Sequence, residues 1–413
     1  MPTPKLEDKG TAYLFTWAEY KLSCQVSGIR EHTDGRITCV VKFTTSDPEY
    51  NEYLYEQGPF NLLGASQTKT NLKNALLKVY KVKVDWDEVI GQICGITLDR
   101  MRSGEPVQEV WTDDAVYPLE YKLYPILPEG EPAICFAEGG SGKSSMGLFI
   151  AICIALPWAD NPLGFKPKFG KPLYLDWETN KATFTRRLAS IRRGHQLPEF
   201  GIAYRRCHMP LEDDINAIHA IVKENAYDTL IIDSVIGAAK GNVNDAEVAQ
   251  NFYRALRKLN VTSFIIHHTS KETMSRSKSP FGSAYWFNLA RSVWELTKSD
   301  DAGNSQIKIM LSHVKSNDDT KHLPIGIRVE FEKENGTTRF SRFDPDKTAE
   351  FDSKLPVSKR ITNLLRGGPL TIKQICDETG IPYNQVKGRL NDLKGSVVTK
   401  LNDNTWGLVH FEI

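Results

Sequence analysis

One octapeptide constrains the fold of this chain more than any other stretch: Ala137-Glu-Gly-Gly-Ser-Gly-Lys-Ser144. It follows an apolar run and precedes an apolar helical stretch. It matches G-x-x-x-x-G-K-[ST] at every position except the first, where alanine replaces glycine. Small residues let consecutive backbone N–H groups surround phosphates at a helix N-terminus, while the lysine neutralises charge and the serine hydroxyl binds Mg²⁺. The pattern predicts an ATP-binding loop formed by Ala137, Glu138, Gly139, Gly140, Ser141, Gly142, Lys143, Ser144 and Ser145.

The composition is that of an ordinary globular protein without a strong charge imbalance. Lys and Arg total 52 and Asp and Glu total 51 in 413 residues, which excludes a histone-like polycation and an acidic tail protein. The seven cysteines are scattered and form no CxxC pair, which argues against a disulfide framework or a zinc ribbon. The longest apolar stretch, Met146–Trp158, is too short to span a membrane. We therefore expect a soluble, cytoplasmic protein with no membrane partner.

The pattern of apolar residues changes along the chain in a way that predicts three domains. Residues 1–112 are interpreted as a small N-terminal α+β domain, with an alternating strand over 37–44 and a helix over 85–102. Residues 113–345 alternate short apolar strands with amphipathic helices, which predicts an α/β domain with a parallel, doubly wound sheet flanked by helices. Its expected strands are Ala133–Phe136, Pro172–Asp176, Thr229–Ile232, Ser263–Ile266 and Ile307–Leu311. A polar linker, 346–354, leads to a small module at 355–413.

Acidic residues at two strand ends fit the needs of Mg²⁺-dependent ATP hydrolysis. Asp233 ends the run Thr229-Leu-Ile-Ile-Asp233, about 90 residues after the phosphate loop, and is expected to hold Mg²⁺ together with Ser144. The alternative is an acid that only precedes a turn. Hydrolysis also needs a base for the attacking water. Glu178 is favoured for that role, with Asp176 in reserve, although both could be solvated surface acids.

The order of the motifs resembles a known family. The phosphate loop, DWET (176–179), LIIDS (230–234), IIHHTSK (265–271) and FGSAYWFNLARSVWEL (281–296) are similar to RecA-like P-loop ATPases of the plasmid RepA hexameric helicase type. The resemblance covers roughly 130–330. It implies a homohexameric ring with ATP at each subunit interface and single-stranded DNA in a central channel. It also implies that Glu178 is the base and His268 the γ-phosphate sensor, although a histidine at a strand end is more often a satisfied core residue.

The resemblance further implies two DNA-contacting loops, Gly237–Glu247 and Thr269–Pro280. The second carries Lys271, Arg276 and Lys278 with a single acid. A basic loop of this kind suits backbone phosphates, and its contacts would depend on salt and not on base sequence. An ordinary solvated loop is the alternative.

Interface ATPases usually receive a cation from the neighbouring subunit, which stabilises charge in the transition state. In the family such cations come from near Arg291 and from a later strand, where this chain has Lys315. Asn317 stands where DnaB-type relatives of this fold often have arginine. The choice between Arg291 and Lys315 therefore stays open, and either could be an ordinary surface residue.

The C-terminal module resembles a winged helix-turn-helix domain. Three short helices are expected at 357–366, 371–379 and 382–394, followed by a hairpin that joins 397–401 to 405–409. The third helix of such domains commonly enters the major groove. Asn384 and Lys387 are expected to face outward there, with Arg389 at the flank, and all three are candidate DNA contacts. From Leu355 onward, eight basic and five acidic residues give a net charge of only +3. Both duplex DNA and a protein partner therefore remain possible.

The leading interpretation is an ATP-dependent DNA motor, most simply a hexameric DNA helicase of phage or mobile-element replication, with ATP and Mg²⁺ as cofactors. One alternative is a RecA-like recombination or repair ATPase that forms filaments. Another is a nucleotide-gated DNA-binding initiator or regulator that reads a specific site with the winged helix. Helicase activity itself rests on family analogy.

Overall fold

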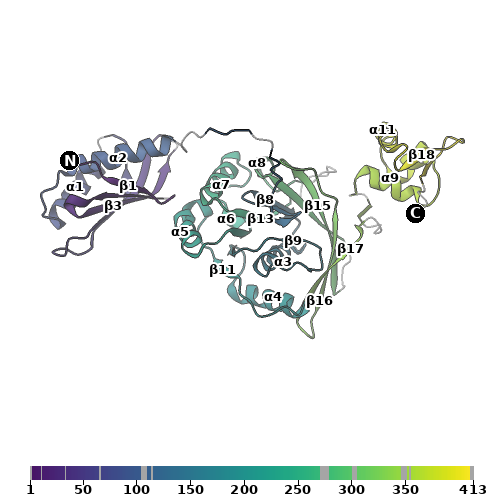
Figure 1. Ribbon diagram of the computed structural model, residues 1–413, viewed down its shortest axis with the longest axis horizontal. Coiled ribbons are helices and arrows are strands. Elements are labelled where there is room, and N and C mark those ends of the chain that lie inside the picture. Colours follow the sequence, from purple (N-terminus) through teal and green to yellow (C-terminus); the bar gives the residue numbers. More distant parts are fainter. Residues whose placement is uncertain are drawn as a thin grey trace. The chain divides into compact units, whose positions relative to one another are not determined.

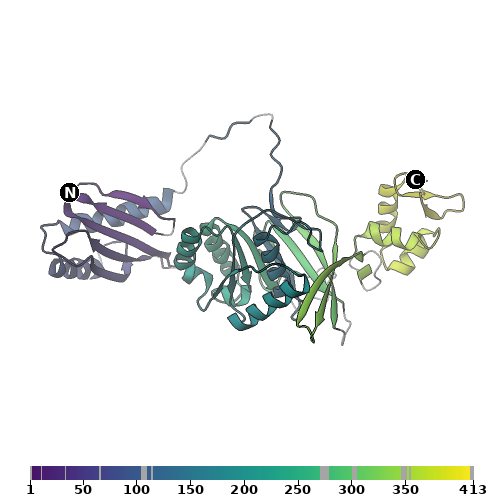
Figure 2. The ribbon, with the colours of Figure 1, turned by 60° about the horizontal axis from the view of Figure 1, so that its bottom comes forward.

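The computed structural model is shown in Figures 1 and 2. It describes residues 2–10, 12–32, 34–64, 67–103, 109–112, 115–269, 279–299, 305–345, 351–352 and 355–409. Its internal contacts define two compact units, one made of Met1–Pro118, Leu211–Ala226 and Arg254–Asn260, the other of Leu119–Pro210, Tyr227–Tyr253 and Val261–Ile413.

The N-terminal part forms an antiparallel meander with two helices. The strands β1 to β5 pair in sequence order, and α1 and α2 contribute to the same apolar cluster (Figure 1). The bounds are β1 (Lys5–Asp8), β2 (Ala12–Trp17), β3 (Leu22–Glu31), β4 (Ile37–Thr45), β5 (Tyr53–Asn61), α1 (Gln67–Val79) and α2 (Trp86–Ser103), with a short 3-10 turn at Ala18–Tyr20. In β4, burial alternates with period 2, as expected for a strand with one face on the core. The strand and the second helix predicted from the sequence are both confirmed.

The α/β core is built on a nine-stranded sheet in the order β11-β10-β12-β13-β8-β14-β15-β16-β17. The strands β8, β10, β11, β12, β13 and β14 run parallel. Their bounds are β8 (Pro132–Ala137), β10 (Pro172–Asp176), β11 (Ala203–Arg206), β12 (Thr229–Asp233), β13 (Thr262–His268) and β14 (Ser292–Lys298). The intervening helices are α3 (Lys143–Ala155), α4 (Lys181–Gly194), α5 (Leu211–Asn225), α6 (Val235–Ala238), α7 (Ala246–Leu259) and α8 (Tyr285–Leu289).

The sheet is mixed, and not wholly parallel as the alternation predicted. The strands β15 (Gln306–Ser316), β16 (Ile325–Glu332) and β17 (Thr337–Phe343) continue it in antiparallel pairs beyond β14. Ile307–Leu311, predicted as another parallel strand, lies in β15. The reason is the length of the connections: parallel strands need a crossover of a dozen or more residues that is usually helical, whereas short links join neighbouring strands antiparallel.

The parallel strands bring the predicted site residues to one edge of the sheet. Cross-strand register aligns Asp176 with Asp233 and His268 with Ala137. All of these lie at the carboxyl ends of their strands. In open α/β sheets, ligands bind outside these ends.

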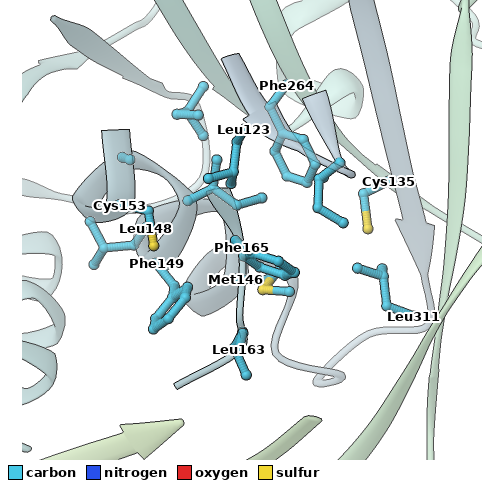
Figure 3. Packing of buried hydrophobic residues seen from close by; sticks show 14 of the residues in the cluster. Leu123, Cys135, Met146, Leu148, Phe149, Cys153, Leu163, Phe165, Phe264 and Leu311 are labelled. Atoms are coloured by element: carbon cyan, nitrogen blue, oxygen red, sulfur yellow. The ribbon is translucent and has the colours of Figure 1, made fainter. Parts of the chain in front are cut away.

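The helix α3, which follows the phosphate loop, is buried on all sides from Met146 to Ile154. Figure 3 shows Met146, Phe149 and Cys153 packed among side chains from β8, β13 and β15. The longest apolar run in the sequence is therefore a core helix. Among the described residues, no helix is both long enough and apolar enough to cross a membrane.

Smaller elements complete the chain. The strands β6 (Tyr121–Tyr124), β7 (Leu127–Pro128) and β9 (Lys166–Pro167) form a three-stranded sheet. The C-terminal module contains α9 (Val357–Leu365), α10 (Ile372–Thr379), α11 (Tyr383–Leu393), β18 (Val398–Lys400) and β19 (Trp406–Leu408). Trp406 and Val386 are buried in its own apolar cluster, and Leu370 bridges to Trp406. All seven cysteines are free thiols, six of them buried.

The linker predicted at 346–354 lies mostly outside the described residues. Of the two residues described there, Phe351 is buried beside Met310 and Leu355. At this position the segment is therefore not a purely polar connector.

Candidate active site at the carboxyl edge of the sheet

The phosphate loop joins the central strand β8 directly to α3. Gly140 and Gly142 have φ of 71° and 89°, in the left-handed region that residues with a Cβ rarely adopt. Ala137, in contrast, is the last residue of β8 and its backbone is extended, so alanine fits where the motif usually has glycine. The departure from the consensus is therefore compatible with the loop conformation.

Lys143 lies folded over the loop. Its Nζ donates to the carbonyl oxygens of Ala137 (2.9 Å) and Glu138 (2.6 Å). Burial lowers the pKa of this ammonium group, while the nearby charges of Glu178 and Asp233 oppose that shift. A phosphate oxygen could replace the two carbonyls, because the ammonium group is a compact, rotatable donor.

Asp233 is buried at the end of β12 with one oxygen satisfied. The Tyr174 hydroxyl donates to Oδ2 at 2.6 Å, whereas Oδ1 has no hydrogen-bond partner among the described residues. Burial raises the pKa of Asp233 to about 6, against the lowering effects of Tyr174 and of the Ser144 hydroxyl beside it. A buried, unsatisfied carboxylate oxygen next to a serine hydroxyl is a donor set that suits Mg²⁺. The residues present therefore fit a bound Mg²⁺ ion.

Glu178 lies in the turn after β10 and is held by two partners. Ser234 Oγ donates to Oε1 at 2.5 Å, and His268 Nε2 lies 3.2 Å from the same oxygen. The hydrogen bond from His268, followed by that from Ser234, lowers the pKa of Glu178 to about 2 despite partial burial. Glu178 is therefore ionised at neutral pH, and it links the end of β12 to the end of β13.

Asp176 has a different environment that does not suit a catalytic base. It is buried and accepts hydrogen bonds from the backbone N–H groups of Glu178 (2.9 Å) and Thr179 (2.8 Å), from Thr179 Oγ1 (2.6 Å) and from Tyr204 (3.1 Å). These contacts fix the turn between β10 and α4. Asp176, predicted as the reserve base, is better explained as the residue that orients Glu178.

The two histidines at the end of β13 differ in exposure. His268 is partly exposed and faces Glu178, as described above. His267 is fully buried, packs edge-on against Trp286 at 5.3 Å, and has its pKa lowered to about 3 by burial. Trp286 Nε1 donates to the Val243 carbonyl (2.9 Å), which also accepts from the N–H of Ser283. This frame ties the end of β13 to the segment between α6 and α7.

A cavity of about 480 Å³ opens beside the first turn of α3. Ser145 lines it together with Arg186, Arg187 and Arg193 of α4. Phe331 and Lys333, from the β16–β17 hairpin, close the other side. The cavity is thus basic, with an aromatic ring in its wall.

The two candidate trans-acting cations lie elsewhere. Ser292 pairs with Ala133 and Val293 pairs with Lys315, so Arg291 and Lys315 lie near the amino ends of β8 and β14. Arg291 lies beside Pro132, at the start of β8, and the phosphate loop begins about five residues later at roughly 3.3 Å per residue. Neither cation can serve the ATP site of its own chain.

The predicted DNA contacts are only partly described. Lys271, Arg276 and Lys278 lie outside the described residues. Asn384, Lys387 and Arg389 are all exposed on α11, and Arg389 pairs with Asp392 at 3.2 Å. Within the described part of the chain, no group of three or more His, Cys, Asp or Glu residues could hold a metal ion.

Sequence reasoning missed three polar residues of the site: Tyr174, Ser234 and Trp286. Tyr174 lies in a buried apolar strand, so nothing in the pattern marks its hydroxyl as functional. Ser234 had a signal, because it directly follows the carboxylate in LIIDS at a strand end.

Comparison with known protein families gives a match over the first part of the α/β core and the residues just before it. The family described as an AAA domain matches residues 100–274. A KaiC-like protein from Pyrococcus horikoshii OT3 has a similar solved structure, with 16% identity, a TM-score of 0.39, and coverage of 55% of this chain and 100% of that chain. No curated protein matches. The AAA-domain match, the phosphate loop and the carboxylates beside it support a P-loop ATPase core.

Proposed function

We propose that the chain is an ATP-driven DNA motor, a RepA-like hexameric helicase that hydrolyses ATP at subunit interfaces and moves along single-stranded DNA. The observation that carries the proposal is the separation of two half-sites. Lys143, Asp233 and Glu178 meet at the carboxyl edge of the sheet, while Arg291 and Lys315 lie near the amino edge. Such a division suits a site completed by a neighbouring copy.

Different residues of the chain would bind different parts of the nucleotide. The backbone N–H groups of the loop hold the phosphates, and Lys143 exchanges the carbonyls of Ala137 and Glu138 for phosphate oxygens. Ser144 and Asp233 would hold Mg²⁺, which when bound neutralises charge on the β- and γ-phosphates. The adenosine end would extend into the basic cavity beside Ser145 and α4.

Glu178 would orient the attacking water. Among the described residues, both hydrogen bonds to this carboxylate use Oε1, which leaves Oε2 to accept from water. With a pKa of about 2, Glu178 is too weak a base to remove a proton early. In a loose phosphoryl-transfer transition state, positioning contributes most, so a weakly basic carboxylate suffices.

His268 would report the γ-phosphate to the DNA-contacting loops. Its backbone carbonyl accepts from the N–H of Phe281 at 2.8 Å. In the sequence, the segment that includes Lys271, Arg276 and Lys278 lies between these two bonded residues. Movement of His268 on ATP hydrolysis would therefore shift the base of that segment. The Trp286–Val243 contact would move the first loop with it.

The test is displacement of a labelled strand from a forked duplex, with oligomer mass measured on the same preparation. We expect hexamers that unwind DNA with ATP, and loss of unwinding in Lys143→Ala and Glu178→Gln without loss of the hexamer. Long filaments on single-stranded DNA would instead favour the recombination or repair ATPase. Hexamers that bind single-stranded DNA and hydrolyse ATP but never displace a strand would contradict helicase function.

A second candidate function is a nucleotide-gated DNA-binding initiator or regulator. It is favoured by α11, where Val386 and Leu390 are buried while Asn384, Lys387 and Arg389 are exposed, as in the recognition helix of a winged helix. It predicts binding to a specific duplex that persists in Lys143→Ala. Duplex binding without sequence preference would argue against it, and no duplex binding would leave a protein as the partner of this face.

A further inference from the structure

The backbone of Arg291 is fixed between two strands. Its N–H donates to the Pro132 carbonyl and its own carbonyl accepts from the N–H of Asn317, both at 3.1 Å. The residue therefore has a defined position at the start of β14. Any variation in where its guanidinium group points must come from the side chain.

The guanidinium group is held side-on by Asp318. Nε donates to Oδ2 at 3.1 Å and Nη2 donates to Oδ1 at 2.5 Å, while the nearest oxygen of Glu131 is 3.9 Å from Nε. Side-on pairing uses one edge of the planar fork and turns the other, with Nη1, away from the carboxylate. The Arg291 side chain is 40% exposed. Asp318 thus orients the cation and leaves donors for a second anion.

Lys315 is engaged differently. Its Nζ donates to the carbonyl oxygens of Phe287 (3.1 Å), Asn288 (2.8 Å) and Ala290 (2.7 Å), at the C-terminal end of α8. An ammonium group has three N–H donors, and these three contacts use all of them. Lys315 therefore stabilises the chain that leads into Arg291, and Arg291 is the better candidate for contact with a phosphate.

The loop that carries Asp318 is itself anchored. The next residue, Asp319, accepts from the Tyr121 hydroxyl at 2.7 Å and from the N–H of Thr320 at 2.6 Å. Further along, His322 stacks on His313 at 5.3 Å with an 8° angle between the rings. Asp318 therefore lies in an anchored loop, unlike the carboxylate in most surface ion pairs.

We propose that Asp318 is a positioning residue, which holds the Arg291 guanidinium group toward the ATP of a neighbouring subunit. The inference rests on the proposed function, because only an interface between copies brings Arg291 to a phosphate. A cation held in advance loses little conformational entropy when it meets transition-state charge. Without Asp318, Arg291 samples several rotamers and stabilises that charge in only a fraction of encounters.

The test is a double-mutant cycle on single-strand-stimulated ATP hydrolysis at saturating ATP, with wild type, Asp318→Ala, Arg291→Ala and the double variant. We expect Arg291→Ala to lower kcat by about 1,000-fold. Asp318→Ala should lower kcat by about tenfold with KM for ATP unchanged, and the double variant should match Arg291→Ala. Asp318→Glu should restore part of the lost rate. Since both side chains are partly exposed, the variants should fold, and thermal melting checks this.

The outcomes separate the inference from the proposed function. If Arg291→Ala lowers kcat but Asp318→Ala does not, or if the two losses multiply in the double variant, Asp318 does not act through Arg291. If Arg291→Ala leaves kcat unchanged, the positioning role falls as well. Where Arg291→Ala does lower kcat, mixing Lys143→Ala subunits with Arg291→Ala subunits tests the interface itself, because each variant alone is inactive. Recovered activity supports catalysis between subunits, and no recovery contradicts the proposed function.

Discussion

The hydrogen bond from Tyr174 to Asp233 provides a direct test of how the site is built. Asp233 is 1% exposed, and Tyr174 supplies the 2.6 Å contact to Oδ2, while no described residue hydrogen-bonds to Oδ1. Tyr174→Phe removes this donor and keeps the ring. Hydrogen bonds to charged groups contribute about 1.5–3 kcal/mol, so the free energy of unfolding at pH 8 should fall by that amount. The pKa of Asp233 should also rise further, because Tyr174 lowers it.

The assay is urea denaturation of the nucleotide-free protein, with Asp233→Ala as the second arm of a cycle. In the Asp233→Ala background, the same tyrosine substitution should cost nothing or stabilise slightly, since the buried hydroxyl has lost its acceptor. Tyr204→Phe is the matched control. Its hydroxyl also donates to a buried aspartate, Asp176, but that residue keeps three other donors, so a loss of only about 0.5–1 kcal/mol is expected. If Tyr174→Phe lowers the free energy of unfolding equally in the wild-type and Asp233→Ala backgrounds, the reasoning is refuted.

Three further predictions concern the close packing at Gly282, the loss of stability in acid caused by His267, and ATP binding in the cavity beside α4. Gly282→Ala should destabilise by about 3 kcal/mol or more in urea denaturation, because Gly282 has φ of 95° and an added Cβ would lie 2.2 Å from the Val243 carbonyl oxygen. His267, buried with its pKa lowered to about 3, should reduce stability as pH falls from 6.5 toward 3, since the unfolded chain binds a proton that the folded chain does not. At pH 5 this amounts to about 2 kcal/mol relative to pH 8, and the difference should disappear in His267→Gln. Arg187→Ala should raise KM for ATP about tenfold in a hydrolysis assay with little change in kcat, since uniform binding is lost.

Each of these has a matched control. Gly201→Ala adds a Cβ to open space and should change stability by less than about 0.5 kcal/mol. A loss as large as that of Gly282→Ala would contradict the steric argument. An unaltered pH dependence in His267→Gln would assign the acid response to other groups, such as His195 and His313, whose pKa values burial lowers to about 4. Lys181→Ala, exposed on the same helix as Arg187, should leave KM unchanged.

The sequence was most informative where one physical requirement determines a local pattern. Buried parallel strands need continuous apolar runs, so the positions of β8, β10, β12 and β13 could be predicted within one or two residues. A phosphate loop needs small residues and a lysine before a helix, which located the turn from β8 to α3. Because parallel strands share one carboxyl edge, Asp233, Glu178 and His268 could be expected together.

What the sequence could not supply depends on contacts between distant residues. The pattern for a buried strand is the same whether its neighbour runs parallel or antiparallel, so the edge formed by β15, β16 and β17 was mispredicted. Asp176 and Glu178 are equally acidic in the sequence, and only the backbone N–H groups around Asp176 tell them apart. Asp318 lies in the polar stretch 316–320, where nothing marks its pairing with a residue 27 positions earlier.

The most direct test of the central claim is the rate of ATP hydrolysis with and without single-stranded DNA, in wild type and in Glu178→Gln. We predict a basal rate that rises severalfold with DNA in wild type. In the variant, both rates should fall by at least about 100-fold while ATP binding persists, because only the group that orients the water is altered. A wild-type rate that is the same with and without DNA would contradict a motor on single strands. An unchanged rate in Glu178→Gln would show that Glu178 has no catalytic role.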